Sequence, residues 1–171
     1  MDIRAYSKLF LTYLILVLLQ IMVFNNINIS ALGITPLFYI LFILVIPYEV
    51  PGWLQLIFAF ILGYTIDIFV DTPGLNAAST VFMAFLRPHI LRFISPRDGY
   101  ENGTHPYLME MGMSWFLNYS IPLVFAHHAT YFMLDSFGFD HFFRTFMKII
   151  LTGIATEILI ILSQYISYRK K

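Results

Sequence analysis

The sequence predicts an all-α integral membrane protein with six transmembrane helices and with both termini in the cytoplasm. The first observation behind this is composition: of 171 residues, 59% are hydrophobic and only 12% are charged, with a mean hydropathy of +0.76. Soluble domains carry roughly 25% charged residues. The second is a series of apolar runs near the roughly 20 residues that a spanning helix needs. Together they predict a single transmembrane domain over residues 1–171.

The predicted spans cover residues 9–27, 29–48, 52–70, 74–94, 107–134 and 142–168. The first ends at Asn25-Asn26, and we interpret it as a retained helix because no small-residue cleavage pattern follows it. In the second, Thr35 and Pro36 are expected as the N-cap and first helical residue of its most apolar part. The proline-rich turn 47–52 ends it, because proline cannot continue the hydrogen-bond ladder of a helix.

The third and fourth spans are joined by the short turn 71–74. A polar loop over residues 95–106 precedes the fifth span, which contains Pro122. The sixth span is followed by the basic residues 169–171. These boundaries leave no room for a soluble catalytic domain on either side of the membrane.

The third observation is the placement of basic residues, which concentrate in cytoplasmic loops. Arg4 and Lys8 precede the first span, Arg92 and Arg97 lie around the loop between the fourth and fifth spans, and residues 169–171 close the chain. Six spans with both ends inside place all of these in the cytoplasm.

Charge and cysteine content exclude several kinds of function. Ten basic residues balance ten acidic ones, so nothing favours a nucleic-acid partner, and the lipid bilayer is the expected environment. The absence of cysteine excludes disulfides, thiolate metal sites and a cysteine nucleophile. No nucleophile–base arrangement or phosphate-binding glycine loop is present, so we expect a protein that is not an enzyme and has no cofactor.

Asp67 and Asp71 lie four residues apart where the third span ends, on one face of the helix. Two such carboxylates can bind a cation or share a proton. For Asp71 we favour a structural role, in which Asp71 or Thr72 caps the fourth helix and Pro73 takes its first turn. Gly74 permits a close approach or unusual backbone dihedrals.

Asp67 is surrounded by apolar residues and is expected to pair inside the bundle, with Lys148 within reach. Glu157 lies midway along the sixth span and needs a partner or a proton. Arg87 lies at nearly the same depth on the fourth span, which predicts a buried Arg87–Glu157 ion pair. Both pairs would fix the register of the helices.

His127 and His128 lie near the outer end of the fifth span. Adjacent histidines point about 100° apart on a helix and are poor joint metal ligands, so we expect no metal site. The alternative is an outer-surface metal site completed by Asp135, Asp140 and His141.

The turn between the third and fourth spans resembles a pattern of the rod-shape-determining MreD family, which has a glycine, a helix-borne aspartate, a short turn and a Gly-Leu pair. The matching residues here are Gly63, Asp67, Pro73 and Gly74-Leu75. The length, the six spans and the short loops of the chain are also similar to that family. In residue detail the resemblance rests on residues 63–78.

The resemblance implies a non-catalytic scaffold of the bacterial cell-elongation complex (the elongasome), in the inner membrane. Such a protein binds the single-pass (bitopic) protein MreC and is linked through it to the actin-like cytoskeleton and the lateral peptidoglycan synthases, and so to cell shape. Its fold is expected to be similar in layout to the substrate-binding components of energy-coupling-factor (ECF) vitamin transporters, a likeness that does not carry function across. The alternative function is such a vitamin-binding component, with an outer pocket lined by polar groups such as Asp67, Asp71, His127, His128 and Asp135.

Overall fold

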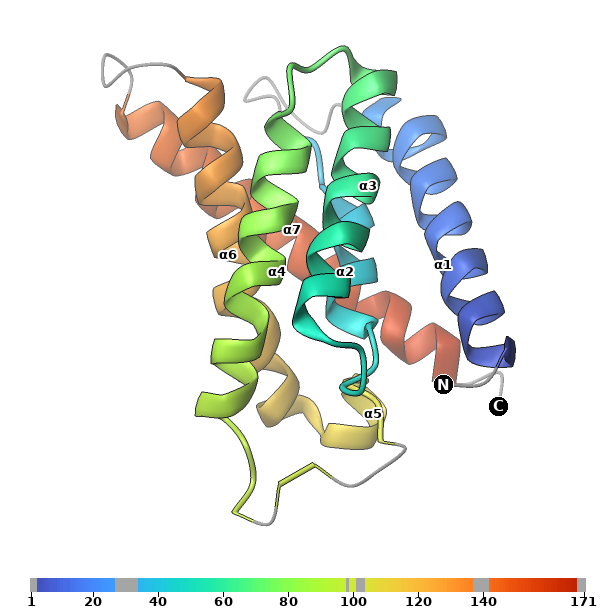
Figure 1. Ribbon diagram of the computed structural model, residues 1–171. Coiled ribbons are helices and arrows are strands. Elements are labelled where there is room, and N and C mark those ends of the chain that lie inside the picture. The colour runs from blue at the N-terminus through green and yellow to red at the C-terminus, as the bar shows by residue number, and fades with distance from the viewer. Residues whose placement is uncertain (1–2, 27–33, 98, 101–103, 137–141, 169–171) are drawn as a thin grey trace.

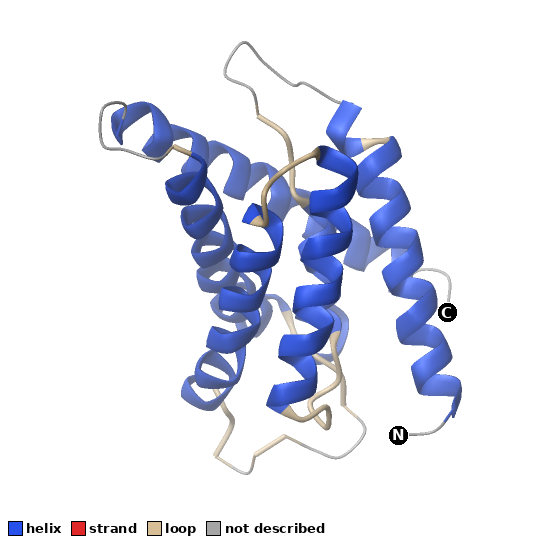
Figure 2. Ribbon diagram, turned by 45° about the horizontal axis from the view of Figure 1, so that its top comes forward, coloured by secondary structure: helices blue, strands red, loops and turns tan. Residues whose placement is uncertain are grey.

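The computed structural model describes residues 3–26, 34–97, 99–100, 104–136 and 142–168, and this part of the chain contains helices and no strands (Figures 1 and 2). In chain order the elements are α1 (Ile3–Met22), the 3₁₀ turns η1 (Phe24–Asn26) and η2 (Phe38–Ile40), α2 (Leu41–Val45), α3 (Gly52–Val70), α4 (Leu75–Phe93), α5 (Leu108–Met111), α6 (Met113–Asp135) and α7 (Phe142–Tyr168).

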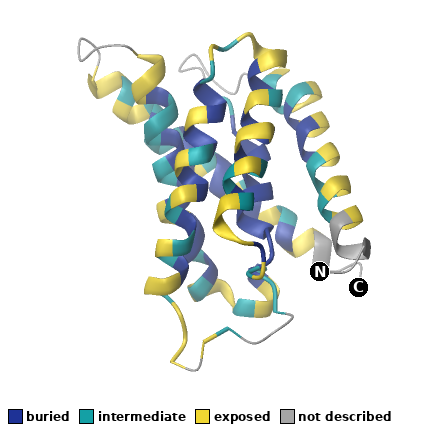
Figure 3. Cartoon of the chain, viewed as in Figure 1, coloured by how far each residue is buried: buried dark blue, intermediate teal, exposed yellow. Residues whose placement is uncertain are grey.

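Three of the described helical segments are long and apolar enough to cross a membrane. They are Ser7–Asn26, Gly52–Val70 and Phe142–Ile166, with mean hydropathies of 2.1, 1.9 and 1.9. Their outward faces carry exposed apolar side chains, as expected for contact with lipid (Figure 3). The chain is therefore an all-helical protein with the character of a membrane protein.

The bounds of α3 and α7 coincide with the predicted spans 52–70 and 142–168, and α4 lies within the predicted span 74–94. The predicted span 107–134 is instead divided at Gly112, which has a φ of 83° and separates the short helix α5 from α6. Two helices contain a proline that does not end them: α4 continues through Pro88, and α6 continues through Pro122.

The predicted second span, 29–48, is wrong as a continuous helix. Residues 34–37 have no regular structure, and only Phe38–Val45 are helical, as η2 followed by the five-residue α2. Residues 27–33 lie outside the described part of the chain. Tyr39, Ile40, Ile43 and Leu44 are fully buried, so protein surrounds this segment on all sides. This explains why its sequence is apolar throughout.

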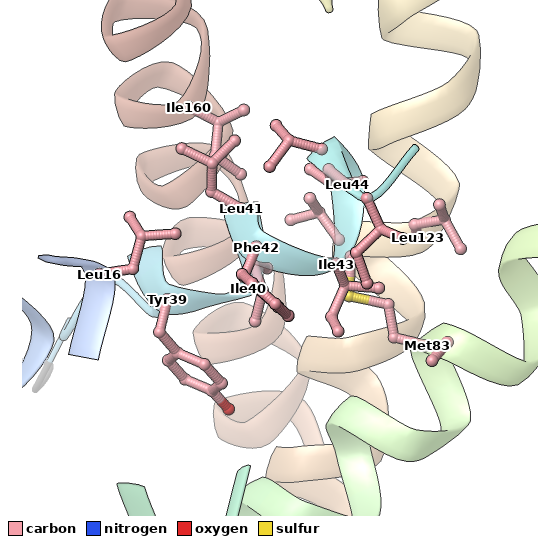
Figure 4. Close-up of a cluster of buried hydrophobic side chains, with 14 of the residues drawn as sticks. Leu16, Tyr39, Ile40, Leu41, Phe42, Ile43, Leu44, Met83, Leu123 and Ile160 are labelled. Carbon is pink, nitrogen blue, oxygen red and sulfur yellow. The ribbon is translucent and has the colours of Figure 1, made fainter. Parts of the chain in front are cut away.

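The core of the molecule is built around α2. Figure 4 shows Ile40, Ile43 and neighbouring residues of this segment among Leu16 of α1, Met83 of α4, Leu123 of α6 and Ile160 of α7, all of which belong to one buried cluster. The longer helices thus surround a short central one. Figure 1 also shows the first turns of α1 and the last turns of α7 at the same end of the molecule, opposite the α3–α4 turn.

Helices α3 and α4 form a hairpin in which the backbones come into close contact at Gly63. A Cβ atom placed on Gly63 would lie 2.5 Å from Ala77 Cα, 2.5 Å from Asn76 O and 2.6 Å from Ala77 N. No side chain fits at these distances, because the atoms in the way belong to the backbone. Glycine at this position lets the two backbones touch.

Candidate functional site

Asp67 belongs to α3, and its side chain binds the first backbone N–H groups of α4. Its Oδ1 accepts hydrogen bonds from the Asn76 N–H and Nδ2–H, each at 3.0 Å, and its Oδ2 accepts from the Ala77 N–H at 2.8 Å. Thr72 donates to Oδ1 through its hydroxyl at 2.5 Å. The first N–H groups of a helix have no intrahelical acceptor, and a carboxylate there also meets the positive end of the helix dipole. Asp67 therefore caps α4 from across the turn.

The predictions that Asp71 or Thr72 caps α4 and that Pro73 takes its first turn are wrong. Asp71 ends α3 in the left-handed conformation, with φ 56° and ψ 45°, and its N–H donates to Asp67 O. The N-cap of α4 is Gly74, also left-handed with φ 84° and without a side-chain capping bond, and Pro73 precedes it. Two left-handed residues, Asp71 and Gly74, thus lie in the turn of the hairpin, and glycine suits such a position because it has no Cβ.

A chain of hydrogen bonds runs from Asp67 into the bundle. Because the Asn76 amide nitrogen donates to Asp67, its Oδ1 is the acceptor that receives the Tyr39 hydroxyl proton at 2.9 Å. Tyr39 Oη then accepts from His127 Nε2 at 3.0 Å, which leaves His127 Nδ1 as a buried acceptor without a hydrogen-bond partner. The chain joins α3, α4, η2 and α6.

Other buried polar side chains supply hydrogen bonds to the backbone at both ends of the short η2–α2 segment. At its start, the Leu37 N–H donates to Thr156 Oγ1 at 3.1 Å and the Tyr39 N–H donates to Gln20 Oε1 at 3.2 Å. At its end, Leu44 O accepts from the Tyr119 hydroxyl at 2.9 Å, and Ile46 O accepts from Arg87 Nη2. A short helix in an apolar setting leaves its end groups without partners, and each such group is costly. Side chains from α1, α4, α6 and α7 provide those partners.

The predicted Arg87–Glu157 ion pair is wrong. Besides Ile46 O, Arg87 donates to Gln55 Oε1 at 2.7 Å and to Tyr119 Oη at 2.6 Å, and its guanidinium lies 5.9 Å from the centre of the Tyr119 ring. Glu157 contacts Ser120, whose hydroxyl donates to Glu157 Oε1 at 2.5 Å. Arg87 is therefore a fully buried cation held by oxygen dipoles, at the C-terminal end of α2, where the helix dipole favours a positive charge.

The predicted Lys148–Asp67 pair is also wrong. The hydrogen bonds of Asp67 all come from residues 72–77, whereas Lys148 Nζ lies 5.9 Å from the centre of the Phe132 ring. The α3–α4 hairpin thus satisfies Asp67 without a basic partner.

His127 and His128 are both fully buried and bind different groups. His128 Nδ1 lies 2.8 Å from Val124 O and its Nε2 lies 3.1 Å from Thr156 Oγ1. Within the described part of the chain, no three His, Asp or Glu side chains gather in a way that could hold a metal ion. Asp140 and His141, which belong to the alternative metal site, lie outside the described residues.

At the opposite end of the molecule, aromatic rings tie the polar loop to the turn before α3. Tyr100 stacks on Tyr48 with ring centres 4.3 Å apart, meets the edge of Trp115 at 6.0 Å, and donates its hydroxyl proton to Leu91 O at 2.8 Å. Burial raises the pKa of the Tyr100 phenol, in the polar loop, above its usual range.

Sequence reasoning missed Gln20, Tyr39, Gln55, Asn76 and Thr156 as structural residues. Four of them carry a visible signal, since a glutamine, asparagine or threonine inside an apolar run needs an internal partner. Their partners could not be predicted, because several are backbone atoms of a segment that was expected to be a regular helix.

Arg87→Met is expected to destabilise the protein by about 3 kcal/mol, because it leaves Ile46 O and Gln55 Oε1 buried without a donor. Glu157→Gln, the matched control, is expected to change stability by less than about 1 kcal/mol, because glutamine keeps an acceptor for Ser120 and is cheaper to bury than a carboxylate. Thermal denaturation in a mild detergent measures both. Equal losses in the two variants would instead support an Arg87–Glu157 pair.

These contacts define a class of protein: a helical membrane protein whose described buried polar groups largely hydrogen-bond to one another and to the backbone. Searches for a matching family of known proteins, a similar curated protein and a similar solved structure each returned no match.

Proposed function

We propose that this protein is a non-catalytic scaffold of the bacterial cell-elongation complex, in the inner membrane, and that it binds an MreC-like single-pass protein. Through that partner it would be linked to the actin-like cytoskeleton and to the lateral peptidoglycan synthases. In this proposal the chain passes the membrane six times, with the segment before α3 as the irregular second pass and with both termini in the cytoplasm.

The observation that carries the proposal is the geometry of the α3–α4 hairpin. Three of the residues that resemble the MreD pattern have a specific role there: Gly63 allows the helices to touch, Asp67 caps α4, and Gly74 is the left-handed N-cap residue of α4. Three residues that together determine the backbone geometry of the hairpin support a structural role for it. The same contacts use both Asp67 oxygens, which supports a structural role for this carboxylate.

A second support is the surface that the helices offer to a single-pass partner. The exposed side chains of α1, α3 and α7 are predominantly large and apolar, and the described loops are short. A partner therefore has to meet this protein mainly through a transmembrane helix. Helix association in membranes depends on close packing and does not need charged groups.

Co-expression with an MreC-like single-pass protein tests the proposal. We expect the two to co-purify as a stable complex in mild detergents, and we expect deletion of the partner's transmembrane helix to abolish the complex. An unrelated single-pass protein with a transmembrane helix of equal length is the control. Failure to co-purify in several mild detergents, with the protein itself folded, would contradict the scaffold function.

A further inference from the structure

We propose that a cavity beside the α3–α4 turn is a binding site for an organic ammonium group, carried either by a small free amine or by an amine-bearing lipid headgroup. This inference is independent of the scaffold function, because a scaffold can hold a lipid or a small ligand at its surface. It rests on the cavity, its charges and its aromatic rings.

The cavity has a volume of about 230 Å³ and lies where several segments meet. Its polar lining comes from Asn25 after α1, Thr35 before η2, Asn76 of α4, and Tyr131 and Asp135 of α6, and apolar side chains including Phe132 complete it. The cavity suits a headgroup or a small amine and is below the range of typical drug-sized pockets.

The charges around the cavity favour a cation. Asp135 is an exposed carboxylate in the lining, and among the described residues that line the cavity none is basic. A second carboxylate, Asp67, lies directly behind Asn76, with its Oδ1 3.0 Å from Asn76 Nδ2. Asn76 itself is committed, since its nitrogen binds Asp67 and its oxygen binds Tyr39. The carboxylate that remains accessible to a ligand in this lining is that of Asp135.

The aromatic residues of the lining are a second reason to expect that the cavity binds an ammonium group. Tyr131 and Phe132 both line the cavity, and aromatic faces attract ammonium groups. The Phe132 ring already attracts the ammonium group of Lys148, at 5.9 Å from the ring centre. Lys148 does not line the cavity, and its positive charge opposes a second cation there, so removing it should strengthen binding.

The test uses the full-length protein in nanodiscs of phosphatidylglycerol, which carries no amine, and follows ethanolamine binding by saturation-transfer NMR. We expect Asp135→Asn to weaken binding about three- to fivefold, as for loss of one exposed charge pair, and Lys148→Gln to strengthen it about twofold. Asp71→Asn is the matched control, because Asp71 is an exposed carboxylate at the same turn that does not line the cavity and asparagine tolerates its left-handed backbone.

A second measurement identifies the source of the ammonium group. Native mass spectrometry after reconstitution into equal parts phosphatidylethanolamine and phosphatidylglycerol counts the lipids that stay bound. Retention of phosphatidylethanolamine that is lost in Asp135→Asn would support a lipid headgroup, and ethanolamine binding without such retention would support a free amine. Equal ethanolamine binding by wild type, Asp135→Asn and Asp71→Asn, no ethanolamine binding by wild type, or binding of neutral glycerol as strong as that of ethanolamine, would overturn the proposal.

Discussion

Gly63→Ala is expected to destabilise the protein by about 3 kcal/mol or to prevent its purification in folded form. The added Cβ would lie 2.5 Å from Ala77 Cα and Asn76 O. Both are backbone atoms, so α3 and α4 have to move apart, and overpacking of this kind costs about 1–3 kcal/mol or more. The separation would also lengthen the bonds from Asp67 to the first N–H groups of α4. Yield of monodisperse protein and the midpoint of thermal denaturation in detergent measure the effect.

Gly52→Ala is the matched control for this change. A Cβ on Gly52 would have no neighbour within 4 Å, and the residue lies at the start of α3 without a left-handed φ. We expect this variant to purify and melt like the wild type. If Gly63→Ala does the same, the close contact between α3 and α4 is not required for folding.

Asp67→Ala is expected to cost about 3 kcal/mol and to weaken assembly with the proposed partner. The substitution leaves the Asn76 and Ala77 N–H groups and the Asn76 amide without their acceptor, in a buried place where each unpaired group costs about 1–3 kcal/mol. Asp67→Asn should lose less, because one oxygen remains, although its NH₂ group would face a backbone donor. Thermal denaturation and co-purification with the partner measure the two effects.

Asp71→Asn is the control that distinguishes the capping role of the Asp67 carboxylate from a general requirement for negative charge at the α3–α4 turn. Asp71 is exposed and contributes its backbone to the end of α3, so we expect wild-type stability and partner binding. A loss as large as that of Asp67→Ala would show that the two carboxylates act as a pair. Assembly of Asp67→Ala with the partner at the wild-type level would contradict the structural role of Asp67.

Span positions could be predicted well where an apolar run faces lipid along one side and ends in recognisable turn residues. This holds for α3, bounded by Pro51 and the Asp71–Gly74 turn, and for α7. It failed for residues 29–48, because an apolar run has the same composition whether it is surrounded by lipid or by protein. The apolar residues 37–46 contact protein in place of lipid, and no periodicity marks that difference.

The partners of charged residues were harder to predict than their positions. Counting residues from one membrane face gave Arg87 and Glu157 similar depths, but depth does not determine which way a side chain points around the helix. The sequence did indicate that Asp67 is buried and structural. It could not show that Asp71 adopts a left-handed backbone, or that the side chain that caps α4 is that of Asp67.

The short central helix α2 has a consequence for the order of biosynthesis. The backbone of the η2–α2 segment depends on Gln20, Arg87, Tyr119 and Thr156, and Thr156 lies in α7, 119 residues after Leu37 in the chain. Until that helix arrives, the Leu37 N–H lacks its acceptor, a costly state in hydrocarbon. Residues 34–46 therefore reach their final hydrogen-bonded state only after α7 has been made.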